Sequence, residues 1–170
     1  MAGNKYLKNN AGVITEQAAL QASAGAGDAG AIVALDSAGR IDTSMMPVGV
    51  AADTATITAS ESLSAGDLVN VWSNGGLFNV RKADASTSGK EAHGYVLAAV
   101  SSSSPAVVYF EGSNTQVSGL TPGRRYLSTS TPGGTQASAP STAGQVVQVV
   151  GYATSSSVLN FDAQIPIVLA

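Results

Sequence analysis

The sequence predicts an all-β protein: a small antiparallel β-barrel or sandwich in residues 49–170, preceded by an extended N-terminal arm in residues 1–48. Two observations predict the β-domain. From residue 54 on, short β-branched runs alternate with turns that contain Gly, Pro or Asn. About eight to ten such strands follow one another at the spacing of a barrel or sandwich. A third observation predicts the arm, because its short apolar pieces bury almost nothing unless another chain or surface covers them.

The arm begins with a segment of ambiguous conformation. Residues 14–22 (ITEQAALQA) could form two turns of helix by propensity. Gly12 precedes them and the glycine-rich residues 23–27 follow, so a helix has little room to propagate. A short helix and an extended arm are equally favoured here.

A small tandem pattern follows in the arm. Asp28 and Asp36 each precede a Gly and then a β-branched residue, Ile32 in the first copy and Ile41 in the second. An Asp side chain can accept a hydrogen bond from its own backbone in an Asx-turn. We therefore expect each Asp to start a turn that leads into a short extended piece.

The boundary of the arm is predicted at residues 44–49 (SMMPVG). Pro47 disfavours the helical region for Met46, and Gly49 permits a sharp change of direction. The β-domain is therefore expected to begin at residue 49.

Strands then alternate with turns. Residues 54–58 form a first strand, and residues 68–72 and 77–81 are expected to pair in an antiparallel hairpin. Asn74–Gly75 suits the type I′ turn of such a hairpin, because both central residues of that turn need a positive φ. Residues 92–100 are apolar on both faces and predict a central strand, followed by a strand at residues 106–111.

The last third of the chain carries the strongest turn signals. Pro122–Gly123 suits a type II turn and predicts a hairpin that leads into a strand at residues 125–128. Residues 132–134 (PGG) turn the chain again, and residues 146–150 (VVQVV) predict a longer strand. Residues 157–170 alternate with a period of about two, and their Pro166 belongs on an edge strand or at a bulge.

Composition excludes several classes of protein. Charged residues make up 11% of the chain, against about 25% in an average protein. A net charge of −3, with scattered Lys and Arg, argues against a nucleic-acid partner. No run approaches the roughly 18 apolar residues of a membrane span, and the N-terminus lacks the apolar core of a signal peptide, so we expect no membrane partner and synthesis in the cytoplasm. Small residues on a weakly charged surface favour β-structure that associates with copies of itself or with another protein.

Residues suited to catalysis or to metal binding are scarce. His93 is the one histidine, no nucleophile elbow surrounds a serine, and cysteine is absent. Asp28, Asp36 and Asp42 do not have the spacing of a Ca²⁺ loop, and turn formation explains them better. A pair of carboxylates from separate strands stays open as a minor alternative. The sequence therefore predicts no catalytic residue, no metal and no cofactor, and the chain is not expected to be an enzyme.

The aromatic residues allow two interpretations. Four rings could bind carbohydrate or could be the large side chains of the core, and the core is favoured: Trp72, Tyr95, Tyr109 and Tyr126. Beside Tyr126, Arg124 and Arg125 are expected in a solvated turn, with an ion pair to an acidic neighbouring subunit as the alternative.

Two groups of segments carry a resemblance to a known family. The first comprises residues 117–128 (VSGLTPGRRYLS), 131–134 (TPGG), 139–144 (APSTAG) and 149–153 (VVGYA). The second is residues 34–49 (ALDSAGRIDTSMMPVG). The first group resembles the C-terminal domain of the head decoration, or capsid cement, proteins of tailed bacteriophages and of related virion fibre proteins. Residues 34–49 resemble the arm that precedes that domain.

The resemblance implies a homotrimer on the outer capsid surface of the virion, where it bridges neighbouring capsomers and contacts the major capsid protein. It brings no catalytic residues. The alternative is a trimeric head or tail fibre or spike subunit that binds a host-surface glycan. The expected capsid or partner contacts lie in the arm: Tyr6, Leu7, Ile14, Ile32, Leu35, Ile41, Met45, Met46 and Pro47.

Overall fold

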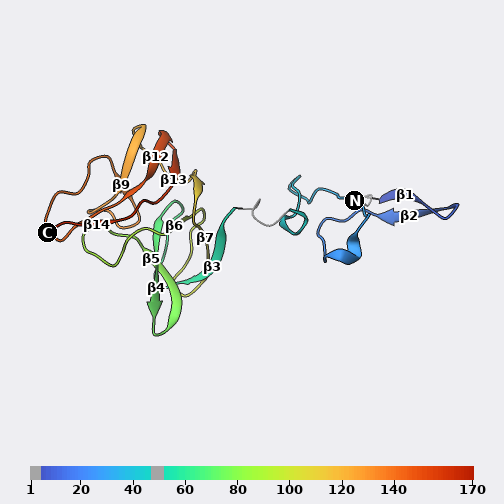
Figure 1. The fold of residues 1–170 in the computed structure, drawn as a ribbon, viewed down its shortest axis with the longest axis horizontal. Helices are drawn as coiled ribbons and strands as arrows, with labels where there is room; N and C mark the ends of the chain where they lie inside the picture. Colours follow the sequence, from blue (N-terminus) through green and yellow to red (C-terminus); the bar gives the residue numbers. More distant parts are fainter. Residues whose placement is uncertain (1–4, 47–51) are drawn as a thin grey trace. The chain divides into compact units, whose positions relative to one another are not determined.

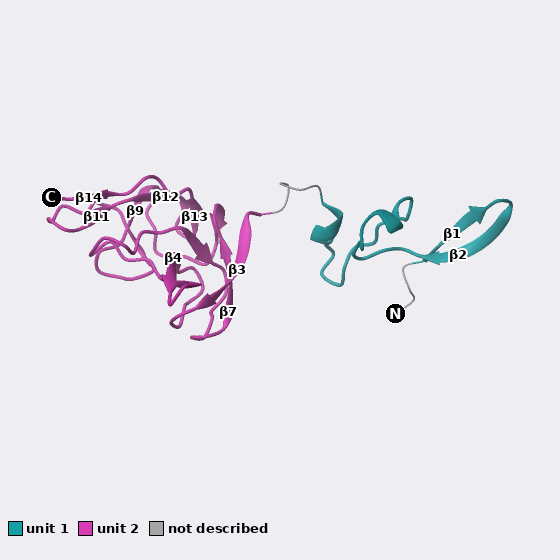
Figure 2. Ribbon diagram, turned by 60° about the horizontal axis from the view of Figure 1, so that its bottom comes forward, with its two compact units in different colours: residues 1–51 teal, residues 52–170 magenta. Residues whose placement is uncertain are grey.

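A computed structural model describes residues 5–46 and 52–170, and it confirms the all-β class (Figure 1). Only two single turns of 3-10 helix, η1 (Ala26–Asp28) and η2 (Thr43–Met45), accompany the strands in the described part of the chain. The chain divides into two compact units, residues 1–51 and residues 52–170, which are coloured separately in Figure 2. The predicted boundary between residues 48 and 49 lies outside the described residues.

The N-terminal unit begins with a β-hairpin. β1 (Lys5–Asn10) pairs antiparallel with β2 (Val13–Ala18) over six residue pairs. Ala11 and Gly12 form the two-residue turn with φ of 51° and 92°, the signs that a type I′ turn requires. The ambiguous residues 14–22 are therefore extended at their start, where residues 14–18 pair with β1.

Aspartates shape the rest of the N-terminal unit. Asp36 Oδ1 accepts from the backbone N–H groups of Ala38 and Arg40, both at 2.8 Å, which confirms the second predicted Asx-turn. Asp28 also starts a turn, since its C=O accepts from Ala31 N–H at 3.1 Å, but its side chain forms no Asx-turn and instead accepts from the preceding Ala24 N–H at 2.6 Å. Asp42 caps η2 by accepting from Ser44 N–H at 2.9 Å. Hydrogen bonding from the Ser44 side chain, and then from its backbone N–H, lowers the pKa of the Asp42 carboxyl.

The C-terminal unit contains a closed barrel of five strands. Around the barrel the order is β3 (Thr54–Ala59), β5 (Leu77–Lys82), β4 (Leu68–Asn74), β6 (Gly94–Val96) and β7 (Pro105–Tyr109). All pairs are antiparallel except β3 with β5, which is parallel. The barrel is therefore mixed rather than purely antiparallel.

A second sheet of five strands completes most of the C-terminal unit. Its order is β10 (Thr135–Gln136), β9 (Gly123–Leu127), β12 (Val149–Ser155), β13 (Val158–Phe161) and β8 (Gly112–Asn114), all antiparallel. The short β11 (Val146–Val147) pairs separately with β14 (Ile167–Val168). Pro166 immediately precedes β14, where it removes no N–H group from a strand.

Two apolar clusters form the core of the C-terminal unit. Small side chains fill the barrel: Ala59, Leu63, Val69, Val80, Val96, Ala106 and Val108. The second cluster joins barrel strands to the five-stranded sheet, with Tyr95 stacked on Tyr109 at 5.4 Å between ring centroids and tilted against Phe161 at 5.5 Å. Adjacent residues of β4 belong to different clusters, because successive side chains in a strand point to opposite faces. Leu68 packs in the second cluster, and Val69 packs inside the barrel.

Two turn predictions need correction. The central residues of the β4–β5 turn are Gly75 and Gly76, with φ of 62° and 87°, because Asn74 still pairs with Leu77. The turn lies one residue beyond the predicted Asn74–Gly75. Pro122–Gly123 makes no hairpin, because β9 pairs only with the later strands β10 and β12.

Two predicted strands are shorter or divided. The run at 146–150 breaks at Gln148 into β11 and β12, which pair with different strands. The run at 92–100 contributes only the three residues of β6 and, further on, an isolated bridge from Val100 to Leu63. At the start of this run the backbone of Ala92 bonds to the buried side chain of Gln148 instead of to a neighbouring strand.

Candidate docking surface of the N-terminal unit

The N-terminal unit has no interior in the part that the structure describes. None of residues 5–46 is buried. Eight of its large apolar side chains are more than a third exposed, and we call them the N-terminal apolar surface: Leu7, Val13, Ile14, Ile32, Val33, Leu35, Ile41 and Met46. Exposed apolar side chains in such number, in a unit without a core, are typical of a region that binds a partner.

The hairpin exposes apolar side chains on both of its faces. Its register places Leu7 and Ile14 together on one face, where they are 73% and 61% exposed. Tyr6 and Val13 share the other face, and Val13 is 62% exposed. An isolated two-stranded hairpin is marginally stable in water, so a partner that covered either face would stabilise it.

An extended segment beside residue 20 carries the next group of predicted contacts. Leu20 bridges to Val33: Leu20 N–H donates to Ile32 C=O at 2.9 Å, and Ala34 N–H donates to Leu20 C=O at 2.7 Å. These bonds fix the backbone of residues 32–34, while the side chains of Ile32 and nearby Leu35 are 52% and 51% exposed. The backbone is thereby satisfied while the apolar side chains remain available.

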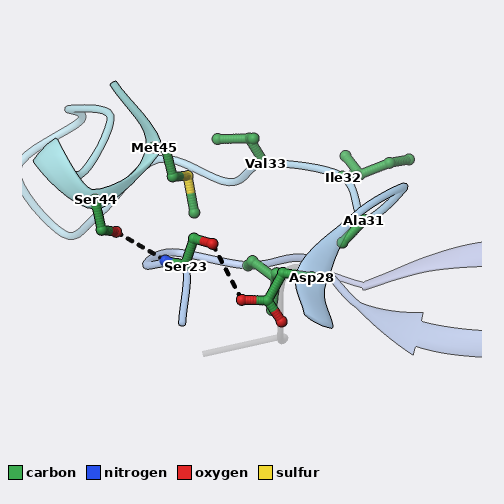
Figure 3. A pocket seen from close by; sticks show the side chains of 8 residues that line it. Ser23, Asp28, Ala31, Ile32, Val33, Ser44 and Met45 are labelled. Atoms are coloured by element: carbon green, nitrogen blue, oxygen red, sulfur yellow. Dashed lines mark hydrogen bonds between the residues drawn. The ribbon is translucent and has the colours of Figure 1, made fainter. Parts of the chain in front are cut away.

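Ile32 lines two hollows among the described residues of this unit. The smaller, about 270 Å³, also includes Val33 and Met45 (Figure 3). Its wall is held by hydrogen bonds from Ser23 N–H to Ser44 Oγ at 2.8 Å and from Ser23 Oγ to Asp28 Oδ2 at 3.2 Å. The hollow is thus a shaped recess with an apolar side and a polar side.

The larger hollow, about 730 Å³, lies beside Tyr6 and Leu35. The Tyr6 hydroxyl is buried and has no hydrogen-bond partner among the described residues. An unpaired buried hydroxyl is costly, so a partner that brought an acceptor here would gain a hydrogen bond.

The structure places the nine predicted contact residues as follows. Six belong to the N-terminal apolar surface: Leu7, Ile14, Ile32, Leu35, Ile41 and Met46. Tyr6 and Met45 are half-buried, and each lines one of the hollows. Pro47 lies outside the described residues, although Met46 before it has the predicted extended backbone, with φ of −93° and ψ of 143°. Val13 and Val33 were not predicted as contact residues from the sequence, because short irregular runs give no clear alternation of apolar and polar residues.

The residues weighed for chemistry have structural partners. His93 Nδ1 accepts from Val71 N–H at 3.0 Å and so continues the β4–β6 pairing. Tyr95 is buried in the core, as favoured, and Trp72 lies half-buried under the Arg81 guanidinium at 4.5 Å. Arg124 and Arg125 lie in β9 rather than in a turn, and Arg125 is 8% exposed.

Two kinds of feature are absent from the described residues. Residues 5–46 and 52–170 contain no group of three or more His, Cys, Asp or Glu side chains placed to hold a metal ion. Within the same ranges no helix has the length and apolar character needed to cross a membrane.

Comparisons with known proteins add no neighbour. The chain matches no protein-family model, no curated protein and no solved structure. The function is therefore inferred from the residues themselves.

Proposed function

We propose that the chain is a structural, non-catalytic protein that decorates the outer surface of a phage capsid as a homotrimer and stabilises it by bridging neighbouring capsomers. The observation that carries the proposal is the N-terminal unit, whose described residues 5–46 include none that is buried and eight large apolar side chains that are exposed. The resemblance of residues 34–49 and of the turn motifs to those of phage decoration proteins supports the major capsid protein as the partner.

The energetics favour binding through the N-terminal unit. Fully burying one large aliphatic side chain contributes about 1.5–3 kcal/mol, so each member of the N-terminal apolar surface that a partner covers would add to the stability of a hairpin that is marginal by itself. Three such units in a trimer would bind neighbouring capsid subunits at once, and avidity would raise the affinity by orders of magnitude. The C-terminal unit, with its own core, would stay folded on the outer side of the shell.

The partners and location follow from this role. The partners are two further copies of the chain and the major capsid protein, and no nucleic acid or membrane is involved. The protein is made in the host cytoplasm and ends on the outer capsid surface of the virion.

The test uses capsids that lack the protein. Purified full-length chain is mixed with them, bound protein is measured by sedimentation and electron microscopy, and the temperature of capsid rupture is recorded. We expect saturable binding and a higher rupture temperature with the protein than without it. Absence of binding to such capsids would refute the proposal.

A matched pair of variants locates the contact. The double variant Leu7→Asp with Ile14→Asp should abolish binding, because it places two charges on one exposed hairpin face. The control is Leu77→Asp with Phe78→Asp, which adds the same charges to side chains 72% and 77% exposed in the C-terminal unit. Loss of binding in the control alone would assign the contact to the barrel instead.

A further inference from the structure

The outward face of the five-stranded sheet carries a row of polar and aromatic side chains. Cross-strand register places Tyr152 opposite Arg124 on one side and opposite Asn160 on the other, and Asn160 opposite Ser113. Tyr126 lies two residues after Arg124 and so on the same face. We call these five residues the Tyr–Arg face; β9, β12 and β13, which carry most of it, lie side by side in Figure 1.

The Tyr–Arg face is open to solvent while the opposite face of the sheet is packed. Arg124, Asn160 and Ser113 are exposed, and Tyr152 is 48% exposed. Their neighbours along the strands point inward, since Leu127, Leu159 and Phe161 belong to the core. None of the five side chains is needed to fill the core.

The positive charge of the Tyr–Arg face is carried by Arg124 alone, because Arg125 is 8% exposed and belongs to the opposite face. The five strands contain no Asp or Glu, although the exposed Glu111 directly precedes β8 and the exposed Asp162 directly follows β13. Within the described residues the two ion pairs are Lys5–Glu16 and Lys82–Asp67, so neither arginine has a carboxylate partner there. Arg124, on β9 and away from these two carboxylates in the strand order, is therefore the group of this face that can attract an anion.

The Arg124 guanidinium shares a face with two tyrosines, Tyr126 on its own strand and Tyr152 opposite it on β12. Contacts with the hydroxyls of Tyr126 and then Tyr152 raise its pKa. A guanidinium positioned in this way keeps donors free for a carboxylate, which it can bind with two parallel hydrogen bonds.

We propose that the Tyr–Arg face binds a carboxylated glycan, with Arg124 donating to the sugar carboxylate, the Tyr152 ring packing against the sugar, and Asn160 and Ser113 bonding to its hydroxyls. Exposed rings beside amide and hydroxyl groups suit a ligand whose rings have apolar faces and polar rims. A nucleic acid would need a larger cluster of Lys and Arg than this face offers. The proposal concerns the C-terminal unit and stands independently of capsid binding.

The experiment measures binding of the purified full-length chain to three immobilised probes: a hyaluronan oligosaccharide, a sialylated oligosaccharide, and the carboxyl-reduced hyaluronan oligosaccharide. We expect saturable binding to at least one carboxylated probe and at least about tenfold weaker binding to the reduced one, since a charge-assisted hydrogen bond is lost. The two carboxylated probes distinguish uronic acids from sialic acids. No saturable binding to either would overturn the proposal.

Variants test the assignment of residues. Arg124→Gln and, separately, Tyr152→Ala should each weaken binding by about tenfold or more, while Lys8→Gln, which removes an exposed charge from the N-terminal hairpin, should leave it unchanged. Circular dichroism checks that each variant is folded, and Tyr152→Phe provides a milder change if Tyr152→Ala is not. If Arg124→Gln and Lys8→Gln weakened glycan binding equally, the binding would reflect general charge attraction, and the proposed site would be refuted. Unchanged binding by Arg124→Gln would also refute the site.

Discussion

At the scale of single residues, one buried polar side chain takes the place of a strand partner. Gln148 is 2% exposed; its Oε1 accepts from Ala92 N–H at 2.7 Å, and its Nε2 donates to Ala92 C=O at 2.9 Å and to Gln164 C=O at 3.3 Å. One side chain therefore satisfies backbone groups that a neighbouring strand would otherwise have paired.

We predict that Gln148→Ala lowers the free energy of unfolding by about 2–4 kcal/mol, because it leaves the buried N–H and C=O groups of Ala92 unpaired. The measurement is urea denaturation followed by tryptophan fluorescence. Gln164→Ala is the matched control, since that side chain is exposed, and it should change stability by less than about 0.5 kcal/mol. Equal effects of the two variants would contradict the role of Gln148.

A second prediction concerns alkaline pH. Burial, and to a lesser degree the charge of neighbouring Tyr109, raises the pKa of Tyr95. The folded state therefore holds this hydroxyl neutral where the unfolded chain ionises it, near pH 10. The stabilising effect is present below that pH and is lost as the pH rises through and above it.

Tyr95→Phe should accordingly flatten the fall of stability above about pH 10. At neutral pH it should cost less than about 1 kcal/mol, because the hydroxyl donates only a long hydrogen bond, 3.4 Å, to Glu111 C=O. Thermal unfolding across the pH range measures both effects. Tyr152→Phe removes an exposed hydroxyl and serves as control; an unchanged alkaline slope in Tyr95→Phe would contradict the prediction.

At the scale of elements, turns are the features that can be tested most directly. The β4–β5 turn has positive φ at both Gly75 and Gly76, and a Cβ at either position would meet open space. Substitutions there change backbone preference without a clash. Gly75→Asn should stabilise the fold by about 0.5 kcal/mol, because it places Asn–Gly at the centre of a type I′ turn.

Gly76→Ala, in contrast, should destabilise by about 1 kcal/mol, because alanine disfavours positive φ. Chemical denaturation of Gly75→Asn, Gly76→Ala and the parent chain measures the two changes in the free energy of unfolding. A stabilising Gly76→Ala would contradict the turn type.

Local signals predicted the elements that depend only on neighbours in the chain. The β4–β5 hairpin and the Pro132–Gly133 turn follow from residues a few positions apart, and Gly133 has the expected positive φ of 81°. Pro122–Gly123 failed because the partners of β9 come later in the chain, at β10 and β12. Which strands pair across long separations is decided by tertiary packing.

At the scale of the whole molecule, the two units differ in what holds them together. Every residue of both core clusters lies in the C-terminal unit, at Ala59 or later. We predict that removing residues 1–51 leaves a folded unit whose melting temperature changes by less than about 2 °C, because no core residue is lost.

Amide hydrogen exchange tests, in the intact chain, whether the two units differ in stability. Amides of residues 5–46 should exchange faster than those of β4 and β12, since the hairpin has no covered face. In the proposed complex with capsids, they should become protected. A truncated chain that unfolds, or strong protection of residues 5–46 in the free protein, would contradict this prediction.

The sequence by itself determined the all-β class and most strand positions, because local alternation and turn residues encode them. Only the tertiary structure decided the closure of the barrel through the parallel β3–β5 pair, the role of Gln148 and the Tyr–Arg face. These features depend on strand pairs and contacts between residues far apart in the chain. Such pairing follows from packing the whole core, which no short window of sequence records.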